Sequence, residues 1–163
     1  MRTITIAAVL VLLFAASASS QQGASGDGVT SAFLLTADDV AAHAAALDRS
    51  VAYANTTVLE REDPATSTGI AYRLAVDRRT PGQRAASHTN EAELWSIIRG
   101  SGEITTDGRI VETMENGESV RRIVGGTVHR VSAGDYLVIP ENVPHQVTGF
   151  DPSLLIVTFE FPR

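Results

Sequence analysis

The segment PGQRAASHTNEAELWSIIRG, residues 81–100, decides how the rest of the sequence is interpreted. A polar stretch that contains His88 leads into an apolar run headed by Glu93. Alternate side chains of a strand share a face, so Glu93, Trp95 and Ile97 are expected to point the same way. The segment therefore predicts a strand that carries a carboxylate on an otherwise apolar face.

Such a carboxylate needs compensation, because its burial costs roughly several kcal/mol without a cation or hydrogen-bond donors. A metal ion is one candidate partner for Glu93, and Arg99 or a backbone amide is the other. His88, five residues earlier, has a side chain that could share a metal with a carboxylate. The competing interpretation is a polar loop that simply feeds a strand.

From Val51 onward the sequence consists of short β-type runs separated by turn signals. The signals are Thr80-Pro81-Gly82, Asp107-Gly108, Asn116-Gly117, Gly125-Gly126, Ala133-Gly134 and Asp151-Pro152. Asp-Gly and Asn-Gly favour two-residue hairpins, because both central positions of that turn need positive φ. Roughly eight or more short strands at close spacing indicate one all-β domain, an antiparallel sandwich or barrel.

One helix precedes the strands, at about residues 36–48. Thr36 lies three residues before Asp39, which is the spacing of an N-terminal capping box. Val40, Ala44 and Leu47 share one face and are expected to be buried. His43 lies at the edge of that face and is interpreted as a surface or capping histidine more readily than as a metal ligand.

The first 18 residues have the pattern of a secretory signal peptide. Arg2 gives a positive start, Ile4 to Ala16 is mostly apolar, and Ala16-Ser17-Ala18 has the small-x-small form of a cleavage site. The apolar stretch is shorter than the roughly 20 residues that span a membrane. We therefore expect a secreted or periplasmic protein with a flexible tether at residues 19–30 and one domain at residues 31–163.

Composition excludes several classes of chemistry. The absence of Cys removes disulfides, thiol nucleophiles and iron–sulfur clusters, and the absence of Lys removes Schiff-base chemistry. The formal net charge is -6 and no basic stripe is visible, which argues against nucleic acid as a partner. The same charge argues against attraction to anionic lipid, so no membrane association is expected after signal cleavage.

A second segment, GDYLVIPENVPHQVTG at residues 134–149, completes a pattern that begins at Gly82. Gly82 is followed by five residues and His88, and Glu93 by six residues and Gly100. Gly134 is followed by five residues and Pro140, and His145 comes later in the same segment. These paired segments resemble the two motifs of the cupin superfamily, and the likeness extends from roughly Tyr72 to Phe161. The resemblance implies a single antiparallel cupin-type β-barrel, or jelly roll, with one N-terminal helix.

Two departures from the family pattern bear on the site. The position two residues after His88 holds Asn90 instead of a second histidine, and the gap to Glu93 is one residue shorter. If the gap is aligned instead, Ala86 occupies the first histidine position, so one histidine of the first motif is missing either way. Asn142 stands where the family has Gly, a change that a turn with positive φ tolerates.

The resemblance implies a metal site built from the remaining donors, His88, Glu93 and His145. Two imidazoles and a carboxylate leave open positions around an ion, and iron, manganese, nickel or zinc would suit them. Asn90 is a possible weak fourth ligand. The competing interpretation is that the metal has been lost and that both histidines are hydrogen-bonded pocket residues.

Four further residues are candidates for the substrate pocket. Trp95 is either a pocket wall beside the metal or a plain core residue. His129 alternates with Val131 and could point into the barrel as an acid–base group. Tyr72 and Arg73 are candidates only because the strand before the motifs passes near them in related barrels.

Two functions follow as hypotheses. The first is an exported metal-dependent cupin enzyme that acts on a small oxygen-rich organic molecule, as a dioxygenase, lyase, decarboxylase or isomerase. The second is a non-catalytic cupin module that binds a sugar or an organic acid. A homodimer is expected from the resemblance alone.

Overall fold

The structure is a computed structural model that describes residues 32–80 and 83–162. The signal peptide and the tether expected at residues 1–30, and Gly82 of the first motif, lie outside the described residues. One helix and eight strands follow one another along the described chain. They are α1 (Ala37–Ala46), β1 (Tyr53–Glu62), β2 (Ile70–Arg79), β3 (Glu91–Thr106), β4 (Arg109–Glu115), β5 (Glu118–Val124), β6 (Thr127–Ser132), β7 (Tyr136–Ile139) and β8 (His145–Pro162).

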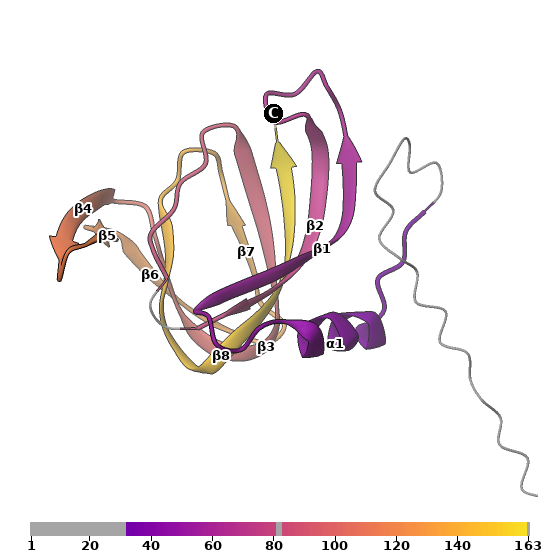
Figure 1. The fold of residues 1–163 in the computed structure, drawn as a ribbon, viewed down its shortest axis with the longest axis horizontal. Coiled ribbons are helices and arrows are strands. Elements are labelled where there is room, and N and C mark those ends of the chain that lie inside the picture. The colour runs from indigo at the N-terminus through magenta and orange to yellow at the C-terminus, as the bar shows by residue number, and fades with distance from the viewer. Residues whose placement is uncertain (1–31, 81–82, 163) are drawn as a thin grey trace, which may run out of the picture.

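The predicted all-β fold with one N-terminal helix is confirmed, and every strand pair is antiparallel. The large sheet has the order β1-β2-β8-β3-β6, and β7 also pairs with β3. The long strands β3 and β8 pair along most of their length, with register shifts that bend both of them. Figure 1 shows the sheet curving into a barrel-like cup, with α1 beside it.

The turn dipeptides behave only partly as predicted. Asn116 and Gly117 have φ of 52° and 86° and join β4 to β5 in a hairpin. Asp107 and Gly108 also have positive φ, at 65° and 66°, but β4 pairs with β5 and forms a separate two-stranded sheet. The Asp107-Gly108 turn therefore leads from the large sheet into the projecting hairpin and forms no hairpin with β3.

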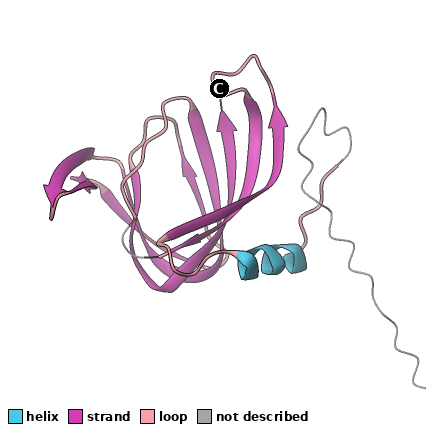
Figure 2. Cartoon of the chain, in the orientation of Figure 1, coloured by secondary structure: helices cyan, strands magenta, loops and turns pink. Residues whose placement is uncertain are grey.

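The helix begins as the sequence predicts. The Thr36 side chain accepts a hydrogen bond from the Asp39 backbone N–H at 3.1 Å, and Asp39 accepts one from the Thr36 N–H at 3.0 Å. The helix ends at Ala46, before Leu47 turns to an extended conformation. Figure 2 shows it as the single helix of the described chain, and it is neither long nor apolar enough to cross a membrane.

Two apolar clusters lie on opposite sides of the sheet. The inner cluster consists of Trp95, Ile97, Ile104, Val131, Ile139, Val147, Leu154 and Ile156. The outer cluster packs α1 against the back of the sheet and consists of Val40, Ala44, Leu47, Val58, Val76 and Leu155. Burial of the predicted helix face is thereby confirmed.

Strand β2 is consequently covered on both faces. Leu74 and Val76 belong to the helix side, where they pack in the outer cluster. Arg73, Asp77 and Arg79 alternate with them, so their side chains point to the inner side of the barrel. This alternation brings charged groups to the face that the site occupies.

Candidate metal centre

Three segments bring the predicted metal ligands together. Glu93 lies near the start of β3, His145 is the first residue of β8, and His88 lies in the loop before β3. Glu93 and His145 are buried, at 4% and 3% exposure, whereas the His88 side chain is 42% exposed. The arrangement agrees with the expectation that Glu93 faces inward beside Trp95 and Ile97.

Backbone hydrogen bonds fix the loop that carries His88. Ala86 and His145 exchange two of them, with N···O distances of 3.0 Å and 2.8 Å. The N–H of Asn142 donates to the carbonyl of His88 at 2.8 Å. Asn142 has a φ of 65°, as expected for a residue that replaces Gly in this turn. These backbone hydrogen bonds thus fix the positions of His88 and His145 relative to each other.

The donor atoms of the three side chains converge. Nε2 of His88 lies 3.8 Å from Oε1 of Glu93, and Nε2 of His145 lies 3.5 Å from Oε2 of the same carboxylate. One donor atom from each residue lies within 4.8 Å of the other two. Ligand bonds of about 2.0–2.2 Å place neighbouring donors roughly 3 Å apart, so this set fits a divalent cation after a small rotation of the exposed His88 ring.

His145 has the tautomer that a metal ligand needs. Its Nδ1 lies 3.1 Å from the Val143 carbonyl, which only accepts, so Nδ1 carries the proton and Nε2 keeps its lone pair toward Glu93. The pKa of His145 is lowered to about 4, mainly by burial and to a smaller extent by the charges of His88 and Arg79, against the Val143 hydrogen bond. The imidazole is therefore neutral at pH 7.

Glu93 has partners within the protein. Burial raises the pKa of Glu93, while the charges of Arg79 and His88 and the Trp95 hydrogen bond lower it. The indole N–H of Trp95 donates to Oε2 at 3.0 Å. Arg99, the cationic partner considered from the sequence, is exposed, and Arg79 of β2 takes that place.

Trp95 is a core residue that also contacts the site. It is fully buried in the inner cluster, and its ring stands edge-on to the His145 ring at a centroid distance of 5.5 Å. The interpretation of Trp95 as a core residue therefore fits the structure, and Trp95 is not among the described residues that line the cavity. It contacts two of the candidate ligands, Glu93 and His145, from the core.

A cavity of about 450 Å³ adjoins the three ligands. Its lining consists of Ala52, Tyr53, Asn55, Arg73, Arg79, Gln83, Arg84, Ala86, His88, Glu91, Glu93, His145 and Glu160. Arg73 lines it, as the sequence suggested. The sequence interpretation missed Tyr53, Arg79, Glu91 and Glu160, which lie on four different strands and meet only through the pairing of these strands in the fold.

Tyr72 and His129, two of the residues proposed for the substrate pocket, lie elsewhere. Tyr72 stacks on Phe159 at a centroid distance of 5.7 Å, because it belongs to the face of β2 opposite Arg73. His129 shares the inner face of the sheet with Ile104, with which it pairs, but it does not line the cavity. Its Nε2 hydrogen-bonds at 2.8 Å the hydroxyl of Thr106, the residue that pairs with His145. Asn90, the possible fourth ligand, is exposed in the turn before β3. It is not among the described residues that line the cavity.

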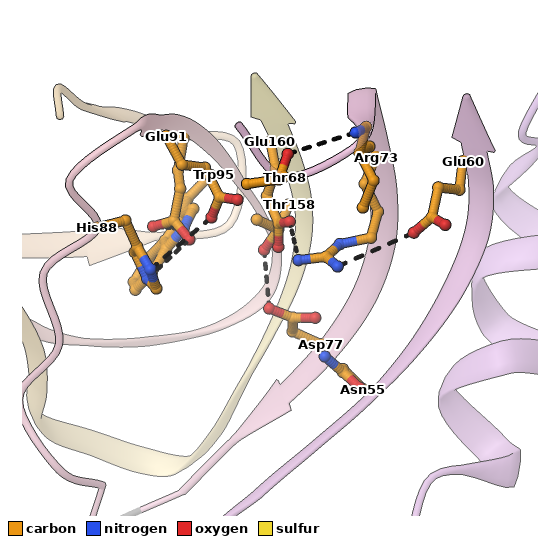
Figure 3. A network of polar contacts seen from close by, with 12 residues as sticks. Asn55, Glu60, Thr68, Arg73, Asp77, His88, Glu91, Trp95, Thr158 and Glu160 are labelled. Carbon is orange, nitrogen blue, oxygen red and sulfur yellow. Dashed lines mark hydrogen bonds and ion pairs between the residues drawn. The ribbon is translucent and has the colours of Figure 1, made fainter. Parts of the chain in front are cut away.

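A second group of charges borders the ligands (Figure 3). Glu91, Glu93 and Glu160 bring carboxylate oxygens within 4.8 Å of one another, and Arg73 forms an ion pair with Glu160. Burial raises the pKa of Glu160 to about 7, against the opposing charge of Arg73. Nδ1 of His88 also lies 3.9 Å from Glu91. The cavity wall is therefore a mixture of carboxylates and guanidinium groups.

No protein-family model matches the chain, and no curated protein matches it. Solved structures do resemble it. The cupin domain of Cnp3 from Schizosaccharomyces pombe shares 7% identity over 74% of this chain and 72% of that chain, with a TM-score of 0.47. KdgF from Halomonas sp. shares 16% identity over 71% and 85%, with a TM-score of 0.43.

A predicted oxalate decarboxylase from Thermotoga maritima shares 18% identity over 68% of this chain and 81% of that chain, with a TM-score of 0.42. At such identities the likeness concerns the fold alone. One of these structures, that of Cnp3, is of a cupin domain.

Proposed function

We propose that this chain is a cupin-type protein that binds one divalent metal through His88, Glu93 and His145 and acts on a small oxygen-rich organic molecule in the adjoining cavity. The observation that carries the proposal is the convergence of these three donors from separate segments on one cavity wall. The neutral tautomer of His145 supports it, since metal binding requires an unprotonated ring nitrogen.

A bound ion would supply Lewis acidity toward a carbonyl or carboxylate oxygen, or oxygen activation if it is iron. The residues of the chain have their own tasks. Glu93 and His145, both buried, keep fixed positions, while the exposed His88 ring leaves access from the cavity. The cavity volume of about 450 Å³ lies in the range of small-molecule sites. Dioxygenase, lyase, decarboxylase and isomerase reactions all suit such a centre.

A second candidate function is a non-catalytic cupin module that binds a sugar or an organic acid. It is favoured by the hydrogen bond from Trp95 to Glu93 and by the nearby charge of Arg79, because these compensate the carboxylate without a metal. Under this proposal His88 and His145 would be hydrogen-bonding groups of the cavity. The two functions differ in whether a metal is taken up.

Metal uptake is the direct test. Protein dialysed against chelator is given iron, manganese, nickel or zinc singly and is then analysed for bound metal. We expect about one equivalent of one ion for the wild type and none for His145→Ala, since the loss of a ligand exceeds the roughly 10–100-fold cost of losing an outer contact. The control is His43→Ala, which removes an imidazole on α1 that does not line the cavity. A metal-free wild type whose melting temperature no metal changes would contradict the proposal.

Export and dimerisation complete the proposal. Residues 1–18 would direct secretion, and the sequence supports this through its charged start, apolar run and small-residue cleavage pattern. A dimer is supported by apolar side chains left exposed on the outer face, namely Tyr136 at 70%, Val138 at 66% and Phe161 at 42%. The N-terminal sequence of the exported protein tests the cleavage of residues 1–18. Sedimentation of the wild type and of Val138→Asp tests the dimer, which the substitution should weaken.

A further inference from the structure

Arg79 occupies an unusual position at the cavity wall. It lies at the end of β2 with a side chain that is only 12% exposed. Its guanidinium carbon lies 4.0 Å from the centroid of the Trp95 ring and 4.7 Å from that of Tyr53. Contact with ring faces engages the flat side of a guanidinium and leaves its edge N–H groups for hydrogen bonds.

The edge of this guanidinium is only partly used. One terminal nitrogen donates to Oδ2 of Asp77 at 2.8 Å, and the other reaches Oε1 of Gln83 only at 3.5 Å, the limit of a hydrogen bond. Asp77 is itself held by the Thr158 hydroxyl, which donates to the same Oδ2 at 2.8 Å. Since a guanidinium offers five N–H donors, Arg79 retains hydrogen-bonding capacity on the side of Gln83, another cavity residue.

The other two arginines that line the cavity are placed differently. Arg73 is paired with Glu160 and lies 3.9 Å from Glu60. Arg84 is 58% exposed at its side chain, where it donates to the Ser119 hydroxyl at 3.2 Å and lies 4.0 Å from Glu112. Among the described arginines of this wall, Arg79 is therefore the one that is buried and still has N–H donors available for a ligand.

Trp95 contacts both the Arg79 guanidinium and the candidate metal centre. Its ring contacts the Arg79 guanidinium, its N–H donates to Glu93, and its edge packs on His145. The guanidinium and the two buried candidate ligands, Glu93 and His145, thus contact the same indole ring. With C–C bonds of about 1.5 Å, an acid of roughly two to four carbons could contact both.

We propose that Arg79 binds a carboxylate of the substrate while another oxygen of the same molecule reaches the metal ligated by His88, Glu93 and His145. The substrate class is then a small organic acid with an oxygen function near its carboxylate. This inference rests on the proposed function. An arginine suits the task because its planar fork matches a carboxylate.

The surrounding charges predict that acid binding depends on the metal. Glu91, Glu93 and, when ionised, Glu160 line the cavity opposite Arg73, Arg79 and the more exposed Arg84, and Asp77 already pairs with Arg79. Without a cation, a further carboxylate would be repelled. A bound divalent ion would add positive charge, so the net electrostatic interaction with the carboxylate of the acid would become attractive.

The test compares acids with their neutral amides. Protein loaded with the metal that it takes up is titrated calorimetrically with malonate and glycolate, and with malonamide and glycolamide. A charge-assisted hydrogen bond corresponds to roughly a 10- to 100-fold preference for the acids. Arg79→Gln should abolish this preference and still bind the metal, and Arg79→Lys should keep part of it. Arg99→Gln, with the same charge change at an exposed residue of β3 that does not line the cavity, should leave it intact.

The outcomes separate this inference from the proposed function. If the wild type takes up no metal, both are overturned. If it takes up metal but binds acids and amides equally, or if Arg79→Gln keeps the preference, only the inference is overturned. Should Arg79→Gln fold poorly because Asp77 is left unpaired, the Asp77→Asn/Arg79→Gln double variant removes both charges and gives the same comparison.

Discussion

The indole N–H of Trp95 donates a hydrogen bond to Oε2 of Glu93 across 3.0 Å, and that oxygen also faces Nε2 of His145 at 3.5 Å. The donor and acceptor are two residues apart on β3, so their side chains share the inner face of the strand. A single hydrogen bond thereby links the fully buried core to the candidate metal centre. It fixes which carboxylate oxygen points toward His145.

Replacing Trp95 by Phe should separate these two roles. The substitution keeps an aromatic core residue but removes the donor, so the free energy of unfolding in chelator should fall by about 2 kcal/mol or more. Metal affinity should fall by roughly 10- to 100-fold, because the carboxylate loses its orienting contact. Urea denaturation and metal titration measure the two effects.

The control is a double-mutant cycle with Glu93→Leu, which has no acceptor, also in chelator. If the hydrogen bond is responsible, the two substitutions should couple by about 1 kcal/mol or more. Additive effects of Trp95→Phe and Glu93→Leu would show instead that the indole acts only through its volume.

His145 predicts a specific pH dependence of the metal-free protein. Its pKa is lowered to about 4 in the folded state, mainly by burial, whereas an imidazole in the unfolded chain has a pKa of about 6.5. Between these values the unfolded chain binds more protons, so stability is complete above the unfolded pKa and is lost as the pH falls toward the folded one. The contribution is on the order of 2–3 kcal/mol.

The comparison uses wild type and His145→Gln, both in chelator, with unfolding measured by denaturant at pH 7, 6, 5 and 4. Other titrating groups are common to both proteins and largely cancel in the difference. We expect the wild type to lose more stability than the variant over this interval. Parallel pH profiles would mean that His145 is not held as a buried neutral imidazole.

The sequence predicted the convergence of three candidate ligands better than the rest of the cavity. Motif spacing identified His88, Glu93 and His145, and alternation along β3 placed Glu93 beside Trp95. The choice between Tyr72 and Arg73 depended on which face of β2 is interior. Alternation gives no answer there, because α1 covers one face and the barrel the other.

Arg79 illustrates a second limit of sequence interpretation. It belongs to neither motif, and its position depends on pairing between β2 and β8, which places Arg73 opposite Glu160 and Asp77 opposite Ile156. Such a register joins segments that are far apart in the sequence. Composition and local pattern carry no signal for it, so the cationic part of the cavity emerges only from the fold.

Gly100 ends the first motif for a steric reason that can be tested. Its φ is +91°, and a Cβ at this position would clash with the backbone carbonyl of Ser153 on β8. Gly100→Ala should therefore lower the free energy of unfolding by about 2–4 kcal/mol, through conformational strain and overpacking together. The measurement is urea denaturation of the purified protein.

Gly117 supplies the matched control. It has a similar φ of +86°, but no atom lies within 4 Å of the Cβ that alanine would add. Gly117→Ala should cost only the conformational strain, about 1–2 kcal/mol. Equal losses in the two variants would show that close packing against Ser153 contributes nothing at Gly100.

Asn142 gives the last prediction, because it adopts a φ of 65°, a conformation that glycine enters more readily, and its N–H donates to the His88 carbonyl at 2.8 Å. Asn142→Gly keeps the N–H and relieves the backbone, so stability and metal affinity should stay within about 0.5 kcal/mol of the wild type. Asn142→Ala keeps the N–H but adds strain of about 1–2 kcal/mol. If that strain is released by moving the turn, His88 and His145 shift apart and metal affinity falls along with stability. Denaturation and metal titration of the two variants distinguish this from a purely local cost, in which Asn142→Ala would lose stability and bind metal as the wild type does.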